Sequence, residues 1–247
     1  MQFEKHALQG KRIAVLAADG FEYVELSVPR LALRAAGASV EIVSLHRGRI
    51  RGMNLTEPSR TVGVDLTVEE ADAQSYDGLL LPGGFISPDF LRQSRAAREF
   101  VSSMDVANKP IATLCHGPWV LVSAELVAGR RLAGWPGIRD DIVHAGGTWR
   151  DEPLVHDHNW VSSRGPQDLD AFVPAMIELF ARGSVAQLRG SMEGSAALDR
   201  VSSPQADEPP RLAVAATRLL PGPGLVTVAA VAAGTALGAL AARRGMH

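Results

Sequence analysis

The chain lacks several features that would point to particular classes of protein. Its 247 residues include a single cysteine, Cys115, so no disulfide can form within the chain and a reducing compartment is expected. The formal net charge is only -2, which disfavours general nucleic-acid binding, because that requires a basic surface to displace counterions from phosphates. No GxGxxG or Walker-type phosphate loop accompanies the glycines, so no nucleotide or other cofactor is expected.

The two ends of the chain differ in their relation to membranes. Charges and a glycine interrupt the N-terminus before any apolar segment reaches the length of a secretory signal, which predicts a cytoplasmic protein. Residues 219–242, by contrast, contain no charged residue and are followed by Arg243 and Arg244. As a helix, residues 225–242 would extend about 27 Å, near the minimum for a bilayer core. The GxxxG pattern at 234–238 suits membrane helix packing, but Ala and Gly are only weakly apolar. A tail anchor and a helix that stays in water or packs on a partner both remain open.

Apolar, β-branched segments alternate with helical patterns over the first 183 residues. Strands are predicted at 11–17, 39–45, 61–66, 78–81, 110–114, 154–155 and 160–163, and helices at 25–36, 88–107, 119–127, 137–145 and 167–182. Residues 49–60 are predicted to form a loop or hairpin excursion. The strand-helix-strand order predicts a parallel sheet covered by helices.

The composition predicts three parts in the chain. Residues 1–183 form the expected catalytic domain, since the last helical pattern ends there. Residues 184–210 are rich in Ser, Gly, Ala, Pro and acidic residues without periodicity, which is typical of a flexible linker. Residues 211–247 form the apolar tail.

Cys115 carries the most informative local pattern. The predicted strand 110–114 runs directly into Cys115-His116-Gly117-Pro118, and a helical pattern follows. Such a sharp turn exposes a nucleophile at the carboxyl edge of a sheet, and the helix N-terminus predicts a lowered thiol pKa. His116 is the candidate acid or base. Alternatively, Cys115 packs as a small buried hydrophobe, and His116 is an ordinary surface histidine.

Two further patterns have a functional and a structural interpretation. Gly83-Gly84 allows close backbone approach after a strand, so its N–H groups and that of His116 could form an oxyanion hole, or the glycines simply form a tight turn. His156 and His158 could share a face and bind a metal, but no second cluster of ligands has convincing spacing. Turn polarity explains these two histidines better, so no metal is expected.

Several segments together resemble a known family. They are DGFEYVEL at 19–26, LLLPGGFISPDFLR at 79–92, PIATLCHGPWVLVSA at 110–124, GIRDDIVHAGG at 137–147 and NWVSSRGPQDLDAF at 159–172. In order and spacing they resemble the PfpI-type intracellular proteases and deglycases of the DJ-1/PfpI branch of the class I glutamine amidotransferase-like superfamily. The resemblance covers residues 10–183 and does not include the tail.

The resemblance implies a flavodoxin-like three-layer α/β sandwich with a nucleophile elbow at Cys115 and with His116 beside it. Glu22 matches the family's protonated loop carboxylate, which hydrogen-bonds to the cysteine sulfur; a carboxyl kept neutral by burial can donate in this way. Asp89 falls where the family carries an acid that reaches the histidine of a neighbouring subunit, which implies a homo-oligomer. In isolation, Glu22 would be a helix N-terminal acid and Asp89 a helix cap.

Three hypotheses for function follow. The first is a cysteine-dependent enzyme acting on small reactive carbonyls, in the manner of glyoxalase III or a deglycase. The second is a peptidase-like hydrolase that uses the same residues on a peptide through an acyl-enzyme. The third is a redox-sensing or chaperone-like stress protein in which Cys115 is oxidised without turnover.

Overall fold

The computed structural model describes residues 6–183 and 201–204. The chain divides between Ala206 and Asp207 into two units, and every described residue belongs to the first. The apolar stretch 219–242 and its predicted anchor therefore lie outside the described residues. Within the described ranges, none of the helices has the length and apolar character needed to span a bilayer.

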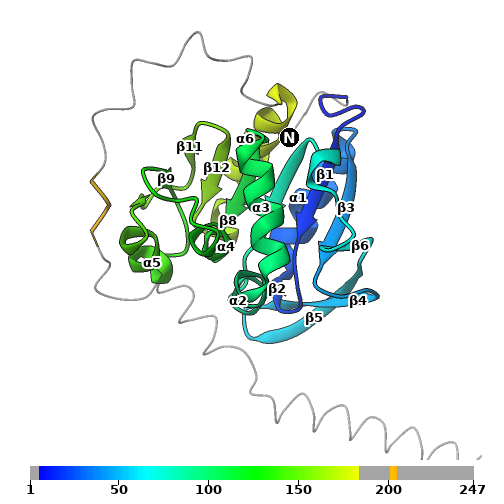
Figure 1. The fold of residues 1–247 in the computed structure, drawn as a ribbon, viewed down its shortest axis with the longest axis horizontal. Helices are drawn as coiled ribbons and strands as arrows, with labels where there is room; N and C mark the ends of the chain where they lie inside the picture. The colour runs from blue at the N-terminus through cyan, green and yellow to red at the C-terminus, as the bar shows by residue number, and fades with distance from the viewer. Residues whose placement is uncertain (1–5, 184–200, 205–247) are drawn as a thin grey trace, which may run out of the picture. The chain divides into compact units, whose positions relative to one another are not determined.

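A seven-stranded sheet forms the centre of the domain, in the order β11-β12-β8-β7-β1-β3-β6 (Figure 1). All neighbouring strands pair in parallel except β11 and β12, which pair antiparallel. The strands are β1 (Arg12–Leu16), β3 (Ser39–Ser44), β6 (Leu66–Thr67), β7 (Gly78–Leu81), β8 (Ile111–Leu114), β11 (Val155–Asp157) and β12 (Trp160–Ser163). Strands β7, β8 and β12 are buried throughout, as parallel strands covered on both faces must be. This confirms the predicted α/β fold with a mostly parallel sheet.

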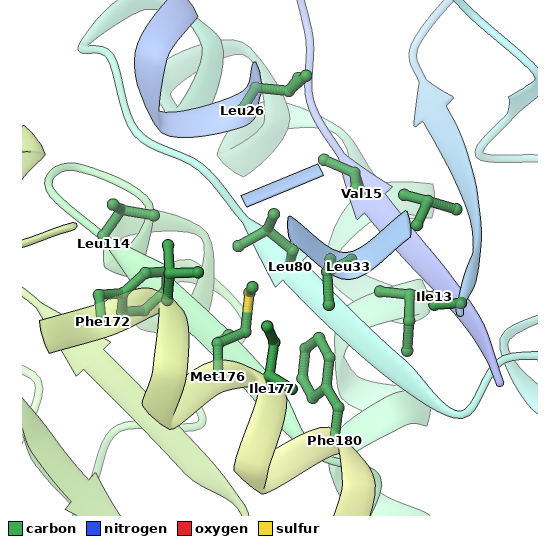
Figure 2. Close-up of a cluster of buried hydrophobic side chains, with 14 of the residues drawn as sticks. Ile13, Val15, Leu26, Leu33, Leu80, Leu114, Phe172, Met176, Ile177 and Phe180 are labelled. Atoms are coloured by element: carbon green, nitrogen blue, oxygen red, sulfur yellow. The ribbon is translucent and has the colours of Figure 1, made fainter. Parts of the chain in front are cut away.

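Helices cover both faces of this sheet because alternate strand residues point to opposite sides. One face packs against α1 (Tyr23–Ala35) and α6 (Leu169–Arg182). Figure 2 shows this core, with Leu26 and Leu33 of α1 and Phe172 of α6 packed over Val15 and Leu80. The other face packs against α3 (Arg95–Val106) and α4 (Pro118–Ser123), with α2 (Ile86–Gln93) and α5 (Arg139–His144) nearby. The result is the predicted three-layer sandwich.

The predicted helix at 88–107 is two helices, because the chain breaks at Ser94. Its backbone is extended, at φ -75 and ψ 122, and its hydroxyl accepts a hydrogen bond from the N–H of Ala97. A serine in this conformation is a favourable N-cap, so it ends α2 and starts α3. Helix α1 also starts earlier than predicted, which places Pro29 in its interior instead of its first turn.

The excursion before β6 is a hairpin, one of the two forms that the sequence left open. It consists of β4 (Arg49–Asn54) and β5 (Glu57–Gly63), and β4 also pairs with β2 (Phe21–Glu22). A second small sheet pairs β9 (Arg131–Leu132) with β10 (Thr148–Trp149). Strands β2, β9 and β10 were not predicted, because strands of two residues are too short to show alternation.

Helix α1 offers a matched pair of leucines that tests the layer arrangement. Leu33 is fully buried in the core of Figure 2, whereas Leu31 is 71% exposed. We expect Leu33→Ala to lower the free energy of unfolding by about 2–5 kcal/mol, through lost burial and the cavity left behind. Leu31→Ala should change it by about 0.5 kcal/mol at most. Urea unfolding of both variants measures this, and equal losses would contradict the packing of α1 described above.

Candidate active site

The candidate site lies at the carboxyl ends of the central parallel strands. Gly83 and Gly84 follow β7, Cys115 follows β8, and Glu25 lies in the first turn of α1, just after β1 and β2. Because parallel strands end at the same edge of a sheet, these segments converge there.

Cys115 occupies a strained elbow that its neighbours hold in place. Its φ is +56, in the left-handed region that residues other than glycine rarely adopt. Its N–H donates to the carbonyl of Ser163 at 3.2 Å, and its carbonyl accepts from the N–H of Trp135 at 2.8 Å. Gly117 makes the turn possible, since an added Cβ would lie 2.5 Å from the carbonyl oxygen of Leu81. The predicted nucleophile elbow is therefore present.

Glu25, not Glu22, is the carboxyl group that lies against the sulfur. Glu25 is fully buried and its Oε2 accepts the N–H of Gly83 at 2.7 Å. This oxygen lies beside Cys115, since a Cβ added at Gly83 would be 2.6 Å from Oε2 of Glu25 and 2.5 Å from Cβ of Cys115. Oε1 of Glu25 is buried and has no hydrogen-bond partner among the described residues. Glu22 instead accepts the N–H of Leu55, in the turn between β4 and β5, at 2.8 Å. The prediction that Glu22 contacts the sulfur was therefore wrong by one helical turn.

The reason for this correction is the position of each residue relative to α1. Glu22 is the last residue before the helix and belongs to β2, beside the hairpin. The buried residues of α1 are Glu25, Leu26, Pro29 and Leu33, so Glu25 lies on the face that packs against the sheet. An ionisable side chain among the apolar positions of an amphipathic helix is the sequence signal that points to Glu25, but it separates Glu25 from Glu22 only once the start of α1 at Tyr23 is known.

Burial determines the protonation of Glu25. Removal from water, together with the smaller effect of the charge of nearby Glu22, raises the pKa of Glu25 to about 8, although the hydrogen bond from the Gly83 N–H opposes the shift. Glu25 is therefore mostly protonated at neutral pH. A protonated carboxyl group can donate a hydrogen bond to the sulfur, as the resemblance required of Glu22.

Burial also raises the pKa of the Cys115 thiol, and this overturns the prediction of a lowered value. Hydrogen bonds from the backbone N–H groups of Gly84 and His116 lower the pKa, but desolvation is the larger effect. The helix that begins at the elbow, α4, has only six residues. Cys115 thus rests as a thiol, and its ionisation requires a nearby base.

His116 is placed to be that base. Its Nδ1 lies 3.2 Å from the sulfur of Cys115. Burial lowers the pKa of His116 to about 4, although the negative charge of Asp141 opposes the shift. The ring contacts Trp119 edge-on and stacks on Trp135, with centroids 5.0 and 5.9 Å away. His116 is therefore neutral at pH 7 and can accept the thiol proton.

The proposed oxyanion-hole donors differ in what they already bind. The N–H of Gly83 donates to Glu25, whereas the backbone N–H groups of Gly84 and His116 lower the pKa of Cys115 by stabilising a charge on its sulfur. A side chain at Gly83 would place its Cβ 2.5 Å from Cβ of Cys115, so this position needs glycine. Gly84 and His116 remain the better candidates for oxyanion stabilisation, and Gly83 instead orients the carboxyl group.

Asp89 lies in α2, and its carboxylate accepts a hydrogen bond from the Gln93 amide one turn later, at 3.0 Å. Its contact with His116 of a second subunit stays a prediction.

His156 and His158 are both exposed, in β11 and the turn that follows it. Between them, Asp157 is buried and forms an ion pair with Arg130, with Oδ2 and Nε 2.9 Å apart. Over residues 6–183 and 201–204, no three His, Cys, Asp or Glu side chains lie close enough together to hold a metal ion. The two histidines accordingly offer no site that the structure supports.

Comparison with known proteins identifies the family of this domain. The model of the DJ-1/PfpI family matches residues 11–179. The chain belongs to the DJ-1/PfpI family. A protein of Pyrococcus abyssi named deglycase is 42% identical over 168 residues, which span 68% of this chain and 98% of the relative. YraA of Bacillus subtilis, whose name assigns it provisionally to cysteine proteases, is 39% identical over 66% of this chain and 94% of its own length. The structure of Drosophila melanogaster DJ-1beta, 24% identical, matches the fold with a TM-score of 0.63 over 69% of this chain and 90% of that one.

The buried carboxyl group of this DJ-1/PfpI domain should make stability depend on pH. The pKa of Glu25 is raised from an ordinary 4.5 to about 8 in the folded state. The stability that this proton contributes to the folded state is therefore fully present below about pH 4.5, and it is lost as the pH rises through about 8. Glu25→Gln keeps the shape and does not ionise. We expect this variant to become more stable than the wild type as the pH rises from 5 to 8, by an amount on the order of a few kcal/mol.

Urea unfolding at several pH values measures this difference. Glu69→Gln, at an exposed position, is the control and should follow the wild type throughout. A constant difference between Glu25→Gln and the wild type from pH 5 to 8 would contradict a raised pKa.

Proposed function

We propose that this protein is a cysteine-dependent enzyme that acts on small reactive carbonyl compounds, in the manner of a glyoxalase III or deglycase. The observation that supports this most directly is the position of the Cys115 sulfur. It lies between a neutral imidazole nitrogen of His116 at 3.2 Å and the carboxyl group of Glu25, which carries its proton at neutral pH. A base for the thiol and a hydrogen-bond donor for the sulfur are therefore both present.

The arrangement supports a covalent route for a dicarbonyl such as methylglyoxal. The sulfur attacks the aldehyde carbon while the thiol proton passes to Nδ1 of His116, so that the C–S bond forms as the C=O π bond opens. His116 then returns the proton to the aldehyde oxygen, which gives a hemithioacetal. Transfer of the hydrogen on that carbon to the neighbouring keto carbon oxidises the first and reduces the second, which yields a thioester. Water then cleaves the C–S bond, releasing lactate and restoring the thiol. Methylglyoxal and one water thus account for every atom of the product.

The deep position of the sulfur favours a small substrate over a peptide. Cys115 is only 6% exposed, and Glu25, Gly83 and Gly84 lie closely around it. An aldehyde of a few atoms needs less room at the sulfur than a folded or extended peptide does. The name of the Bacillus subtilis relative supports a peptidase as the second candidate.

Methylglyoxal and a set of variants test the proposal. The wild type should convert methylglyoxal to lactate, while Cys115→Ser should lose the activity by a factor on the order of 1000 or more, since a serine hydroxyl lacks comparable acidity. Glu22→Gln should keep more activity than Glu25→Gln, because only Glu25 contacts the sulfur. Lactate is measured enzymatically after fixed times.

Equal lactate formation by the wild type and Cys115→Ser would contradict the enzyme proposed here. Cleavage of casein or a fluorogenic peptide that Cys115→Ser loses, with no lactate formed, would favour the peptidase. Selective oxidation of Cys115 by dilute peroxide, without either turnover, would favour a redox sensor.

We also propose that Asp89 completes the site of a neighbouring subunit in a homo-oligomer, as the family resemblance implies. Cys115→Ser and Asp89→Asn should each be inactive alone. Mixed oligomers, produced by co-expression, contain sites that combine Cys115 of one variant with Asp89 of the other, so activity should return in part. Lactate formation by separately purified and co-expressed proteins measures this, and full activity of Asp89→Asn alone would contradict a shared site.

A further inference from the structure

A short segment beyond the catalytic domain, residues 201–204, lies against β10 and α5; we call it the tail segment. In Figure 1 it is the gold stretch of chain near β9 and α5. The N–H of Ser203 donates to the carbonyl of Trp149 at 2.9 Å, and the N–H of Trp149 donates to Oγ of Ser202 at 3.2 Å. Oγ of Ser203 accepts a hydrogen bond from the N–H of Asp151 at 3.0 Å, and the carbonyl of Ser203 accepts one from Nε of Arg139 at 2.8 Å. Composition alone placed these residues in a flexible linker.

The tail segment covers the outer edge of the β9–β10 sheet. Alternate N–H groups of the chain from 148 to 151 point in opposite directions, as in any strand. Those of Thr148 and Arg150 donate to β9, at the carbonyls of Arg130 and Leu132. Those of Trp149 and Asp151 point away from β9 and donate to the tail segment. An edge with open donors of this kind readily accepts an extended peptide.

We propose that the outer edge of β10, together with Arg139, is a docking site for an extended serine-containing peptide segment, and that its occupant is the tail segment of the same chain. Two serine hydroxyls take the place of the carbonyl acceptors that a regular strand would supply. Nε of Arg139, on α5, donates to the carbonyl of Ser203, the residue before Pro204. Four hydrogen bonds with α5, β10 and Asp151, which follows β10, thus hold the Ser-Ser pair in one register.

Docking at this edge connects to the candidate active site through two tryptophans. Nε1 of Trp149 donates to the carbonyl of Gly134 at 3.2 Å, one residue before Trp135. The backbone N–H of Trp135 holds the carbonyl of Cys115, and its ring stacks on His116. The docked segment is thus linked through Trp149 to the backbone that directly precedes Trp135.

Amide hydrogen exchange of the full-length protein, resolved by residue with NMR, tests the docking. Ser202→Ala should speed exchange of the Trp149 amide by about tenfold while largely sparing that of Asp151, and Ser203→Ala should do the reverse. Ser203→Pro removes the donor to Trp149 and should speed exchange at both. The amides of Thr148 and Arg150 donate to β9, so they are internal controls and should stay protected in all three variants.

Unchanged exchange at Trp149 and Asp151 in all three variants would overturn the proposal. So would protection of these two amides that rises with protein concentration, since it would mean that the tail segment of a second copy occupies the site. Loss of protection at Thr148 and Arg150 as well would show that the small sheet has unfolded in that variant. In that case a free peptide spanning residues 199–206 is added to Ser203→Pro. The peptide must restore protection of the Trp149 amide if the edge is a docking site. None of these readouts depends on enzymatic activity, so a failed lactate assay leaves them intact.

Discussion

The contact between a buried carboxyl group and a buried thiol is the constraint on which the candidate site depends. Glu25 and Cys115 are both removed from water, and burial raises the pKa of each group. Two such groups cannot both ionise side by side at neutral pH without a large penalty. Both groups therefore keep their protons at rest, and in the proposed function neutral His116 is the base for the attack on a carbonyl. In that proposal, negative charge would develop on the substrate beside the backbone N–H groups of Gly84 and His116.

Backbone hydrogen bonds and closely packed glycines hold Cys115 in place at the candidate site. The left-handed turn at Cys115 is fixed from β12 by Ser163 and from the next segment by Trp135. Gly83 and Gly117 are glycines because an added Cβ would collide with the site or with the strands beneath it. Strain at the elbow is thus supported from several sides, which is how a residue with φ of +56 persists.

The alternation of helices with the longer strands of the large sheet, and the sharp turn at Cys115, could be predicted from the sequence, whereas the place of His116 beside Cys115 was implied only by the family resemblance. Apolar runs and glycines are local signals, and they report local structure well. The identity of the carboxyl group could not be obtained in that way. Glu22 and Glu25 differ by three positions, and only the start of α1 at Tyr23, an exact boundary, determines which one faces the sheet. The thiol pKa was mispredicted for a similar reason, since sequence shows a helix start but not the depth of burial. Likewise, composition cannot reveal that Ser202 and Ser203 meet an open strand edge, because that contact joins residues more than fifty positions apart.

The central claim is that Glu25 carries a proton at neutral pH beside the buried sulfur of Cys115. Infrared difference spectroscopy of the wild type against Glu25→Gln measures it directly, through the carbonyl stretch of a protonated carboxyl group. The account predicts that this band is present at pH 7, disappears as the pH is raised through about 8, and shifts in Cys115→Ser because its hydrogen-bond partner has changed. A wild type that shows only the carboxylate bands at pH 7 would contradict the account.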